Sequence, residues 1–438
     1  MKRESMKDLI EWKKRSGRKP LIIRGVRQSG KTWLMKEFGK AHFKSFAYIN
    51  FDNNSRMQKL FAGDYDIKRI ISGLELESGV KITPEHTLVI LDEIQECSAA
   101  VSSLKYFNEN KPEYMIVAAG SLLGIALSGT SFPVGKVEFL DLFPMNYFEF
   151  VRAAGQEKLL EPAEKGDFEL TNAFSDKYID LLRNYYFTGG MPEAIAEFVK
   201  TGSYENTRRI QQNILSAYEQ DFSKHIPAGI VTRLRMLWNS IPAQLAKENH
   251  KFIYGLIRHG ARAKEYEAAL TWLCDYGISC KVNRISKPGM PLKAYEAGSI
   301  FKLYISDVGL LGTLCGLDAK TLLEGSKVFT EFKGALSEQY VFQELRNLKD
   351  LQISYWAAEK GTAEVDFVVQ SEGVVVPVEV KAEENLKSKS LKSYRDLYKP
   401  SIAVRASMSG FKRENGLVNI PLYLISLLQD IIKKRKSK

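Results

Sequence analysis

Short apolar runs recur along the first third of the chain, separated by stretches with helical or loop-like patterns. Each run is apolar on both faces, which is typical of buried strands in a parallel α/β sheet. The four clearest runs are residues 21–23, 46–51, 88–91 and 114–118. Residues 137–142 add a further strand candidate, and residues 1–16 predict a short basic helix. The pattern therefore predicts an α/β domain at the start of the chain.

The pattern changes to a helical period from about residue 147. Residues 170–222 predict a mostly helical block that is interrupted by Gly-Gly-Met-Pro at 189–192. Residues 226–312 then predict helices followed by a hairpin. Residues 317–425 predict the order helix, strand, strand, turn, strand, helix, strand.

A phosphate-binding motif follows the first apolar run. Residues 25–32 read Gly-Val-Arg-Gln-Ser-Gly-Lys-Thr, which is the G-x-x-x-x-G-K-T pattern of a P-loop. Backbone N–H groups of such a loop, and the positive end of the helix that follows, bind phosphate oxygens. Lys31 is expected to reach the β- and γ-phosphates of ATP, and Thr32 to hold Mg²⁺. The predicted nucleotide contacts are Gly25, Gln28, Ser29, Gly30, Lys31 and Thr32.

Polar residues end two of the other apolar runs. Asp92 and Glu93 follow the run at 88–91, where a buried acid is costly unless a cation neutralises it. Asp92 is therefore a predicted Mg²⁺ ligand, and Glu93 a predicted catalytic residue that polarises water against the γ-phosphate. The alternative for Glu93 is an ordinary surface turn residue. Ser121, after the fourth run, is either a γ-phosphate contact or a simple helix cap.

These motifs together resemble the prokaryotic AAA-type ATPases whose C-terminal half is a domain of unknown function. The resemblance extends to about residue 385. It implies that the Glu after the Mg²⁺-binding Asp marks an enzyme that hydrolyses ATP. The matching stretches are residues 25–32, 48–51, 88–95, 120–121, 142–150 and 189–193.

The chain departs from this family at two positions. Ala119 stands where Thr is usual, and Lys136 follows Gly135 where Arg is usual. Lys lacks the planar fork of Arg, so we expect ATP turnover to be slow. An arginine finger is left open among Arg24, Arg27, Lys136 and Arg152, and a homo-oligomer is left open as well.

The middle of the chain predicts a winged helix. Residues 252–260 and 262–274 predict two helices joined by a short turn. A hairpin is expected next, with strands at 278–285 and 291–297. Helix-turn-helix plus hairpin is a layout common in DNA-binding proteins, and it also serves for packing against protein partners. The predicted phosphate contacts on the wing are Lys281, Arg284, Lys287 and Lys293.

Three charged residues interrupt apolar strands near the C-terminus. Asp366 lies in the strand candidate 364–369, and Glu379 and Lys381 end the candidate 374–380. This D-x₁₂-E-x-K pattern resembles the core of restriction-endonuclease-like nucleases. The resemblance implies that Asp366 and Glu379 hold Mg²⁺, that Lys381 orients or activates water, and that Glu338 supports them from a preceding helix. The alternative is a degenerate nuclease fold whose charges form a salt bridge.

Composition narrows the class of protein. The 438 residues are 45% hydrophobic and 26% charged, which excludes a disordered or collagen-like chain. No apolar run is long enough to span a membrane, no signal peptide is evident, and the four cysteines have no metal-binding spacing. We therefore expect a cytoplasmic protein that does not bind a membrane.

The net charge of +11 is unevenly distributed. Residues 1–20 carry eight basic and three acidic residues, and residues 429–438 carry five and one. Residues 247–302 carry ten and five, so the rest of the chain is slightly acidic. Plain solvated charge can explain the two ends, whereas the excess at 247–302 favours nucleic acid as a partner, with DNA preferred over RNA.

The predicted fold class is α/β: a P-loop domain with a parallel sheet, then helical and winged-helix segments, then a restriction-endonuclease-like α/β domain. The expected function is ATP binding and hydrolysis by a protein that acts on or is regulated by nucleic acid, with a Mg²⁺-dependent nuclease domain. The alternative is a nucleotide-switched regulator without nuclease activity. The expected boundaries are 1–152, 153–225, 226–316 and 317–438.

Overall fold

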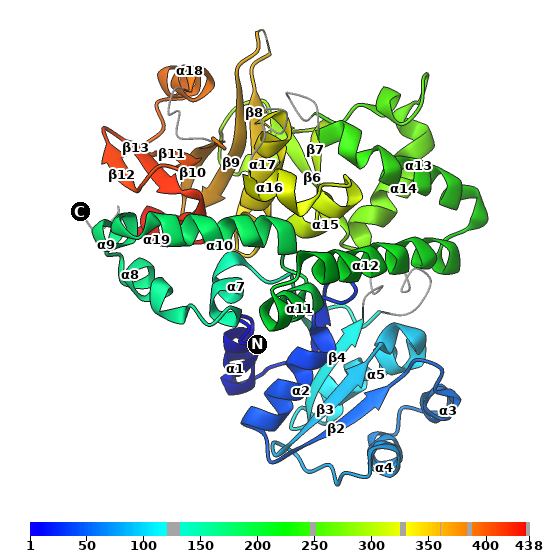
Figure 1. Ribbon diagram of the computed structural model, residues 1–438. Coiled ribbons are helices and arrows are strands. Elements are labelled where there is room, and N and C mark those ends of the chain that lie inside the picture. Colours follow the sequence, from blue (N-terminus) through cyan, green and yellow to red (C-terminus); the bar gives the residue numbers. More distant parts are fainter. Residues whose placement is uncertain (121–131, 246–250, 325–329, 360, 383–387, 435–438) are drawn as a thin grey trace. The chain divides into compact units, whose positions relative to one another are not determined.

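The computed structural model describes residues 1–120, 132–245, 251–324, 330–359, 361–382 and 388–434 (Figure 1). The chain divides into two compact units. The N-terminal unit comprises Lys2–Phe143 and Asp275–Gly277, and the C-terminal unit comprises Pro144–Cys274 and Ile278–Lys438.

The N-terminal unit is built on a five-stranded sheet in the order β2-β3-β4-β1-β5, in which every neighbouring pair is parallel. The strands are β1 (Leu21–Arg24), β2 (Ser45–Asn50), β3 (Thr87–Asp92), β4 (Met115–Gly120) and β5 (Glu138–Asp141). All residues of β3 and β4 are buried, as expected for central strands covered on both faces. The predicted strands are confirmed to within one or two residues at their ends.

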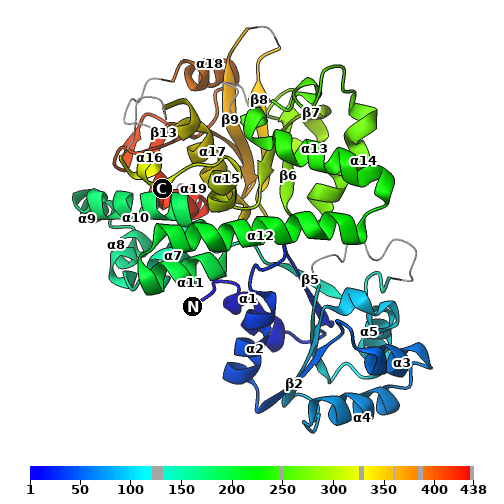
Figure 2. The ribbon, with the colours of Figure 1, turned by 45° about the vertical axis from the view of Figure 1, so that its right-hand side comes forward.

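Helices cover both faces of this sheet (Figure 2). On one face, α1 (Met6–Lys14) and α2 (Lys31–His42) pack Trp12 and Phe38 against Ile23. On the other face lie α3 (Ser55–Ala62), α4 (Ile67–Ser78), the 3-10 turn η1 (Ile94–Glu96) and α5 (Ser98–Asn110). The basic helix expected at the N-terminus is therefore not simply solvated charge, because Leu9 and Trp12 anchor it in the core.

The C-terminal unit begins with a helical block. Its elements are α7 (Tyr147–Ala153), η2 (Glu157–Leu159), α8 (Leu160–Lys165), α9 (Phe168–Ala173), α10 (Ser175–Thr188), α11 (Pro192–Thr201), α12 (Tyr204–His225) and α13 (Ala228–Leu245). The interruption predicted at 189–192 is confirmed, since α10 ends before Gly189 and α11 begins with Pro192 at its first position.

An eight-stranded mixed sheet forms the rest of this unit, in the order β12-β13-β11-β10-β9-β8-β6-β7. Its strands are β6 (Ser279–Ile285), β7 (Glu296–Ile305), β8 (Gln352–Ala357), β9 (Glu364–Ser371), β10 (Val374–Val380), β11 (Ala403–Ser407), β12 (Lys412–Glu414) and β13 (Leu417–Pro421). The helical elements around it are η3 (Tyr254–Leu256), α14 (Ala263–Asp275), η4 (Leu292–Tyr295), α15 (Val308–Leu314), α16 (Ala319–Glu324), α17 (Thr330–Arg346), α18 (Lys389–Tyr398), η6 (Leu422–Leu427) and α19 (Leu428–Lys433).

Two details of the predicted winged helix are wrong. The helix expected at 252–260 is only the single turn η3, because the backbone before it is already paired: Phe252 N–H donates to Phe301 and Ile253 N–H to the Gln244 side chain. The second strand of the hairpin begins at Glu296 instead of residue 291, after the turn η4. The helix predicted at 262–274 is present, one residue later, as α14 (Ala263–Asp275).

The hairpin is not a free wing, because β6 pairs in parallel with β8. This pairing joins Arg284 to Tyr355 and Ile285 to Trp356, so the hairpin and the C-terminal strands share one sheet. The boundary expected between residues 316 and 317 therefore does not separate two sheets.

The α/β class is confirmed: a five-stranded parallel sheet is followed by helices and a C-terminal mixed sheet. None of the helices in the described ranges combines the length and the apolar character needed to cross a membrane.

Candidate functional site

The P-loop lies between the end of β1 and the start of α2, as its sequence predicts. Gly25 is required by close approach, because a Cβ atom there would collide with the carbonyl group of Leu142. Gln28 and Gly30 have φ angles of 65° and 93°, in the left-handed region. Left-handed residues of this kind let the backbone of a P-loop curl so that its N–H groups can face phosphate oxygens.

Lys31 is held inside this loop. Its ammonium donates to the carbonyl oxygens of Gly25 at 2.8 Å and Val26 at 3.0 Å, and the residue is 7% exposed. Burial lowers the pKa of Lys31 to about 8, and the charges of Glu93 and Asp92 only partly oppose this effect. A buried cation bonded to neutral carbonyl groups is well suited to receive an anionic phosphate.

Asp92 ends β3 and collects three hydrogen bonds. The Thr32 hydroxyl donates to its Oδ2 at 2.7 Å, the Tyr48 hydroxyl donates to the same oxygen at 3.0 Å, and the Glu93 N–H donates to Oδ1 at 3.1 Å. The structure thus brings together the two predicted Mg²⁺ ligands of the P-loop domain. Tyr48, on the neighbouring strand β2, is a partner that the motif alone did not reveal.

Glu93 leaves the strand with φ 51°, an uncommon value for a residue with a side chain. Its Oε2 accepts a hydrogen bond of 2.6 Å from the Gln95 amide. Asp92 is the last residue of β3, whereas Glu93 lies in the turn between β3 and η1. Two acids with separate roles, one for a cation and one for water, fit this arrangement.

The P-loop residues fit a nucleotide with Mg²⁺. Thr32 and Asp92 offer the oxygen donors that Mg²⁺ prefers, and phosphate oxygens and water complete its octahedron in such sites. Ser29 Oγ is buried and, within the described part of the chain, has no hydrogen-bond partner. An orphaned hydroxyl group inside the loop fits the role of a donor to a phosphate oxygen.

Arg3 is a residue of this site that the sequence interpretation missed. Its guanidinium donates to the carbonyl oxygens of Ser29 at 2.9 Å and Phe143 at 2.7 Å. Arg3 is buried, so it braces the P-loop from the chain start instead of adding to a solvated basic end. An Arg near a chain end carries no motif that could have indicated this role.

Most of the cations considered as arginine fingers have acidic partners. Arg24 pairs with Asp141 at 2.9 Å, Lys136 with Glu109 at 2.8 Å, and Arg152 with Glu164. The positive charge of Arg27 helps to lower the pKa of Lys31. Ser121, the predicted γ-phosphate contact, lies outside the described residues.

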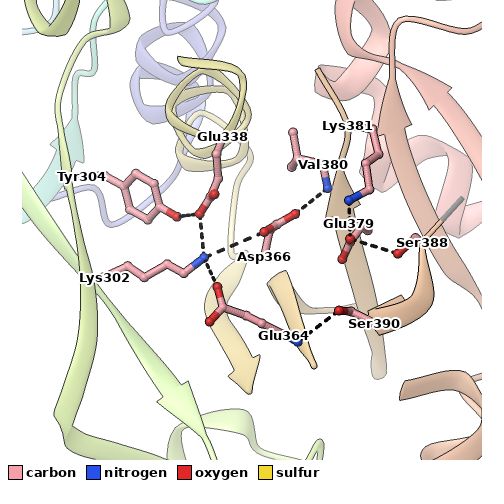
Figure 3. Close-up of polar contacts among 10 residues, drawn as sticks. All are labelled: Lys302, Tyr304, Glu338, Glu364, Asp366, Glu379, Val380, Lys381, Ser388 and Ser390. Carbon is pink, nitrogen blue, oxygen red and sulfur yellow. Dashed lines mark hydrogen bonds and ion pairs between the residues drawn. The ribbon is translucent and has the colours of Figure 1, made fainter. Parts of the chain in front are cut away.

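A second charged cluster lies in the C-terminal sheet (Figure 3). Glu338 comes from α17, Glu364 and Asp366 from one face of β9, and Glu379 and Lys381 from the end of β10. The structure brings the four predicted residues of the nuclease-like site together. The Asp366 carboxylate accepts from Val380 N–H at 2.7 Å, which joins the two strands at this point.

The two predicted catalytic residues at the end of β10, Glu379 and Lys381, form an ion pair with each other. Lys381 Nζ lies 2.9 Å from Glu379 Oε1, and the Ser388 hydroxyl donates to the same oxygen at 2.9 Å. Burial tends to lower the pKa of Lys381, but the Glu379 carboxylate outweighs it and raises that pKa above the ordinary value. Lys381 therefore stays protonated and is poorly suited to act as a general base.

The cluster contains a cation that the sequence interpretation missed. Lys302 of β7 is fully buried, and its Nζ lies 2.8 Å from Glu338 Oε1 and 2.7 Å from Glu364 Oε1. The Tyr304 hydroxyl also donates to Glu338. A sequence signal existed, because Lys302 is a single charge within the apolar run 300–305 and shares its strand face with Tyr304.

The nuclease-like cluster does not fit the predicted Mg²⁺ site. The ammonium of Lys302 already neutralises Glu338 and Glu364. Burial, and then the charges of Glu379 and Glu338, raise the pKa of Asp366 well above its ordinary value, so a metal ion that bound Asp366 would have to displace its proton. In the described ranges, no group of three or more His, Cys, Asp or Glu side chains is arranged to hold a metal ion.

Three family models match separate stretches of the chain. Residues 17–151 match the model of an AAA domain. The parallel sheet and the P-loop geometry agree with this match, so residues 17–151 resemble an AAA domain with a P-loop. Later in the chain, residues 179–321 match a domain of unknown function (DUF8612), and residues 333–425 match another (DUF4143).

Solved structures give more distant likenesses. A Walker-type ATPase of Pyrococcus abyssi is 14% identical with a TM-score of 0.44, covering 71% of this chain and 94% of that one. Cdc6p of Pyrobaculum aerophilum is 11% identical with a TM-score of 0.27, covering 73% and 92%. A Vibrio cholerae protein is 9% identical with a TM-score of 0.17, covering 95% and 97%. TM-scores this low do not establish a shared fold. No curated protein matches the sequence.

Proposed function

We propose that this protein binds ATP with Mg²⁺ at the AAA domain and hydrolyses it. The observation that carries the proposal is the joint placement of Lys31 inside the P-loop and of Thr32 against Asp92 at the end of β3. Lys31 would contact the β- and γ-phosphates, and Thr32 and Asp92 would hold Mg²⁺, which supplies charge neutralisation between the phosphates. Glu93 would orient and polarise the attacking water.

ATP hydrolysis by the full chain tests this proposal. Lys31→Ala should abolish ATP binding, whereas Glu93→Gln should keep binding and lower turnover by about 10²–10⁴-fold, the usual contribution of a general base. Lys40→Ala is a matched control, because Lys40 lies on the same helix and pairs with Glu37 at the protein surface. Equal rates in wild type and Lys31→Ala would refute the enzymatic proposal.

We further propose that the protein acts on, or is regulated by, nucleic acid, with DNA as the first candidate. The support is the basic excess at 247–302 and the exposure of Lys287 and Lys293 around the turn of the hairpin. Lys281 and Arg284 contribute less, since both are half-buried.

Salt-dependent DNA binding distinguishes the hairpin from the basic ends. Lys287→Ala with Lys293→Ala should weaken binding and flatten its salt dependence by about one unit of slope for each phosphate that is no longer neutralised. Lys7→Ala with Lys14→Ala removes the same charge from the exposed part of the N-terminal helix and should have little effect. The opposite result would assign nucleic-acid binding to nonspecific charge at the ends.

A second candidate function is a nucleotide-switched regulator that cleaves nothing. The order of α17, β8, β9, β10, α18 and β11 agrees with a restriction-endonuclease-like core, in which β9 pairs antiparallel and β11 parallel with β10. The ion pairs of Lys302 and Lys381 favour a non-cleaving form of such a core. Mg²⁺-dependent cleavage of DNA or RNA that is lost in Asp366→Ala and Glu379→Ala would exclude this candidate.

A further inference from the structure

Lys302 is a buried lysine that lies among three acidic side chains. It projects from β7, at the edge of the eight-stranded sheet, and its side chain is 0% exposed. Figure 3 shows its ammonium between Glu338 and Glu364, with Asp366 to one side. Asp366 Oδ1 lies 3.9 Å from Lys302 Nζ. The three acids come from a helix and a strand that the nuclease-like core supplies, whereas the lysine comes from outside that core.

The cluster is arranged for a cation. An isolated buried carboxylate is strongly disfavoured, and three of them converge here on one point. The Lys302 ammonium lies 2.8 Å from Glu338 Oε1, 2.7 Å from Glu364 Oε1 and 3.9 Å from Asp366 Oδ1. Its position is therefore that of a bound cation.

Glu379, the fourth acid of the cluster, also indicates that the cluster has more acidic than basic groups. Glu379 is 4% exposed, and its Oε2 has no hydrogen-bond partner within the described residues, although Lys381 and Ser388 bind its Oε1. Glu379 thus keeps an orphaned carboxylate oxygen beside its ion pair with Lys381, at the end of the strand next to Asp366. Because an ammonium group carries one charge and Mg²⁺ or Mn²⁺ carries two, the lysine leaves part of the acidic charge unmatched.

We propose that Glu338, Glu364 and Asp366 form a cation site that the chain fills with its own ammonium group, that of Lys302. The described acids are not arranged to hold a metal ion while the lysine lies among them, and we propose that removing its charge lets them close around a divalent metal ion. In the wild-type protein the lysine excludes the metal by occupying the space and by neutralising the ligands. The occupant also links two parts of the chain, because β6 joins β8 through a pairing of two residues on each strand and Lys302 adds an ionic interaction beside that short pairing.

Mn²⁺ binding to the nucleotide-free full chain tests the proposal. Lys302→Met removes the charge while preserving an unbranched apolar stem. Calorimetric titration should show a Mn²⁺ equivalent in Lys302→Met that wild type lacks, and this gain should disappear in Lys302→Met with Asp366→Asn. Lys302→Arg retains the charge and should resemble wild type. The test does not involve the P-loop, so its outcome is independent of ATP hydrolysis.

Two results would overturn the proposal. One is a folded Lys302→Met protein that binds no more Mn²⁺ than wild type. The other is wild-type binding that is already lost in Asp366→Asn, which would mean that the acids hold a metal with the lysine in place. If Lys302→Met is poorly folded, Mn²⁺ should raise its melting temperature more than that of wild type, and the absence of that rise would equally refute the proposal.

Discussion

At the scale of single residues, two buried lysines illustrate how surroundings decide chemistry. Lys31 rests on neutral carbonyl groups, so burial dominates and lowers its pKa to about 8. Burial also acts against the charge of Lys302, but three carboxylates outweigh it and raise its pKa. Lys31 is a cation that is bonded only to neutral carbonyl groups, whereas Lys302 already forms ion pairs with carboxylates of the chain. Only the first of these two is ready to receive a phosphate group.

The lowered pKa of Lys31 predicts that ATP affinity depends on pH. Below about pH 8 the ammonium is charged and attracts phosphate, and above it the neutral amine is favoured in the free protein. We expect the Kd for ATP to rise between about pH 7 and pH 9, where an ordinary lysine would remain charged. Fluorescence titration with a labelled ATP measures this directly. Lys40→Ala, which leaves Lys31 in place and should show the same rise, is the control, and a flat wild-type profile would contradict the prediction.

At the scale of elements, the Gly189-Gly190 turn connects the helical block to the rest of the C-terminal unit. The Gly190 N–H donates to Asp307, whose carboxylate also accepts from Leu310 N–H at the start of α15. Burial raises the pKa of Asp307 to about 6, and these N–H donors only partly offset it. The Gly-Gly-Met-Pro motif is therefore explained by packing, because it lets a backbone approach a buried acid.

Gly190→Ala should destabilise the protein, because the new Cβ would collide with the carbonyl of Met145. Overpacking of this kind typically costs about 1–3 kcal/mol. Gly229→Ala is the matched control, since a Cβ at Gly229 meets no neighbouring atom within the described residues. Chemical denaturation of both variants measures the difference, and equal midpoints would show that the turn can relax.

The region around residue 255 shows why some elements could not be predicted. The run 252–260 has a helical pattern, but its backbone groups are already hydrogen-bonded to other parts of the chain. Lys251 forms an isolated antiparallel β-bridge with Lys302, and the Gln244 side chain binds both the N–H and the C=O of Ile253. By contrast, β3 and β4 are apolar on both faces and have a single way to bury that surface. A run that is apolar on both faces therefore predicts its secondary structure well. The structure of a short amphipathic run depends on which other parts of the chain contact it.

At the scale of the whole molecule, the two units have separate hydrophobic cores. The N-terminal unit buries both faces of its parallel sheet, and the C-terminal sheet has its own core around Trp356, Val368 and Tyr394. Because each unit buries its own apolar surface, we expect each to unfold as its own cooperative step.

ATP with Mg²⁺ should therefore stabilise one of two thermal transitions. A ligand at about 100-fold its Kd adds about 2.7 kcal/mol to the unit that binds it, so only the transition of the N-terminal unit should move. Scanning calorimetry with and without ATP and Mg²⁺ measures this, with Lys31→Ala as the control in which neither transition moves. A single transition that shifts as a whole would contradict the expected independence.

The sequence by itself determined the P-loop, the parallel sheet around it and the identity of four acids and bases in the C-terminal cluster. These features are local: a motif with fixed spacing, apolar runs of strand length, and charges inside apolar strands. Only the tertiary structure placed Arg3 against Ser29 and Lys302 among Glu338, Glu364 and Asp366. Each of these interactions joins residues more than twenty positions apart, and what a buried charge does depends on which partners the fold brings to it.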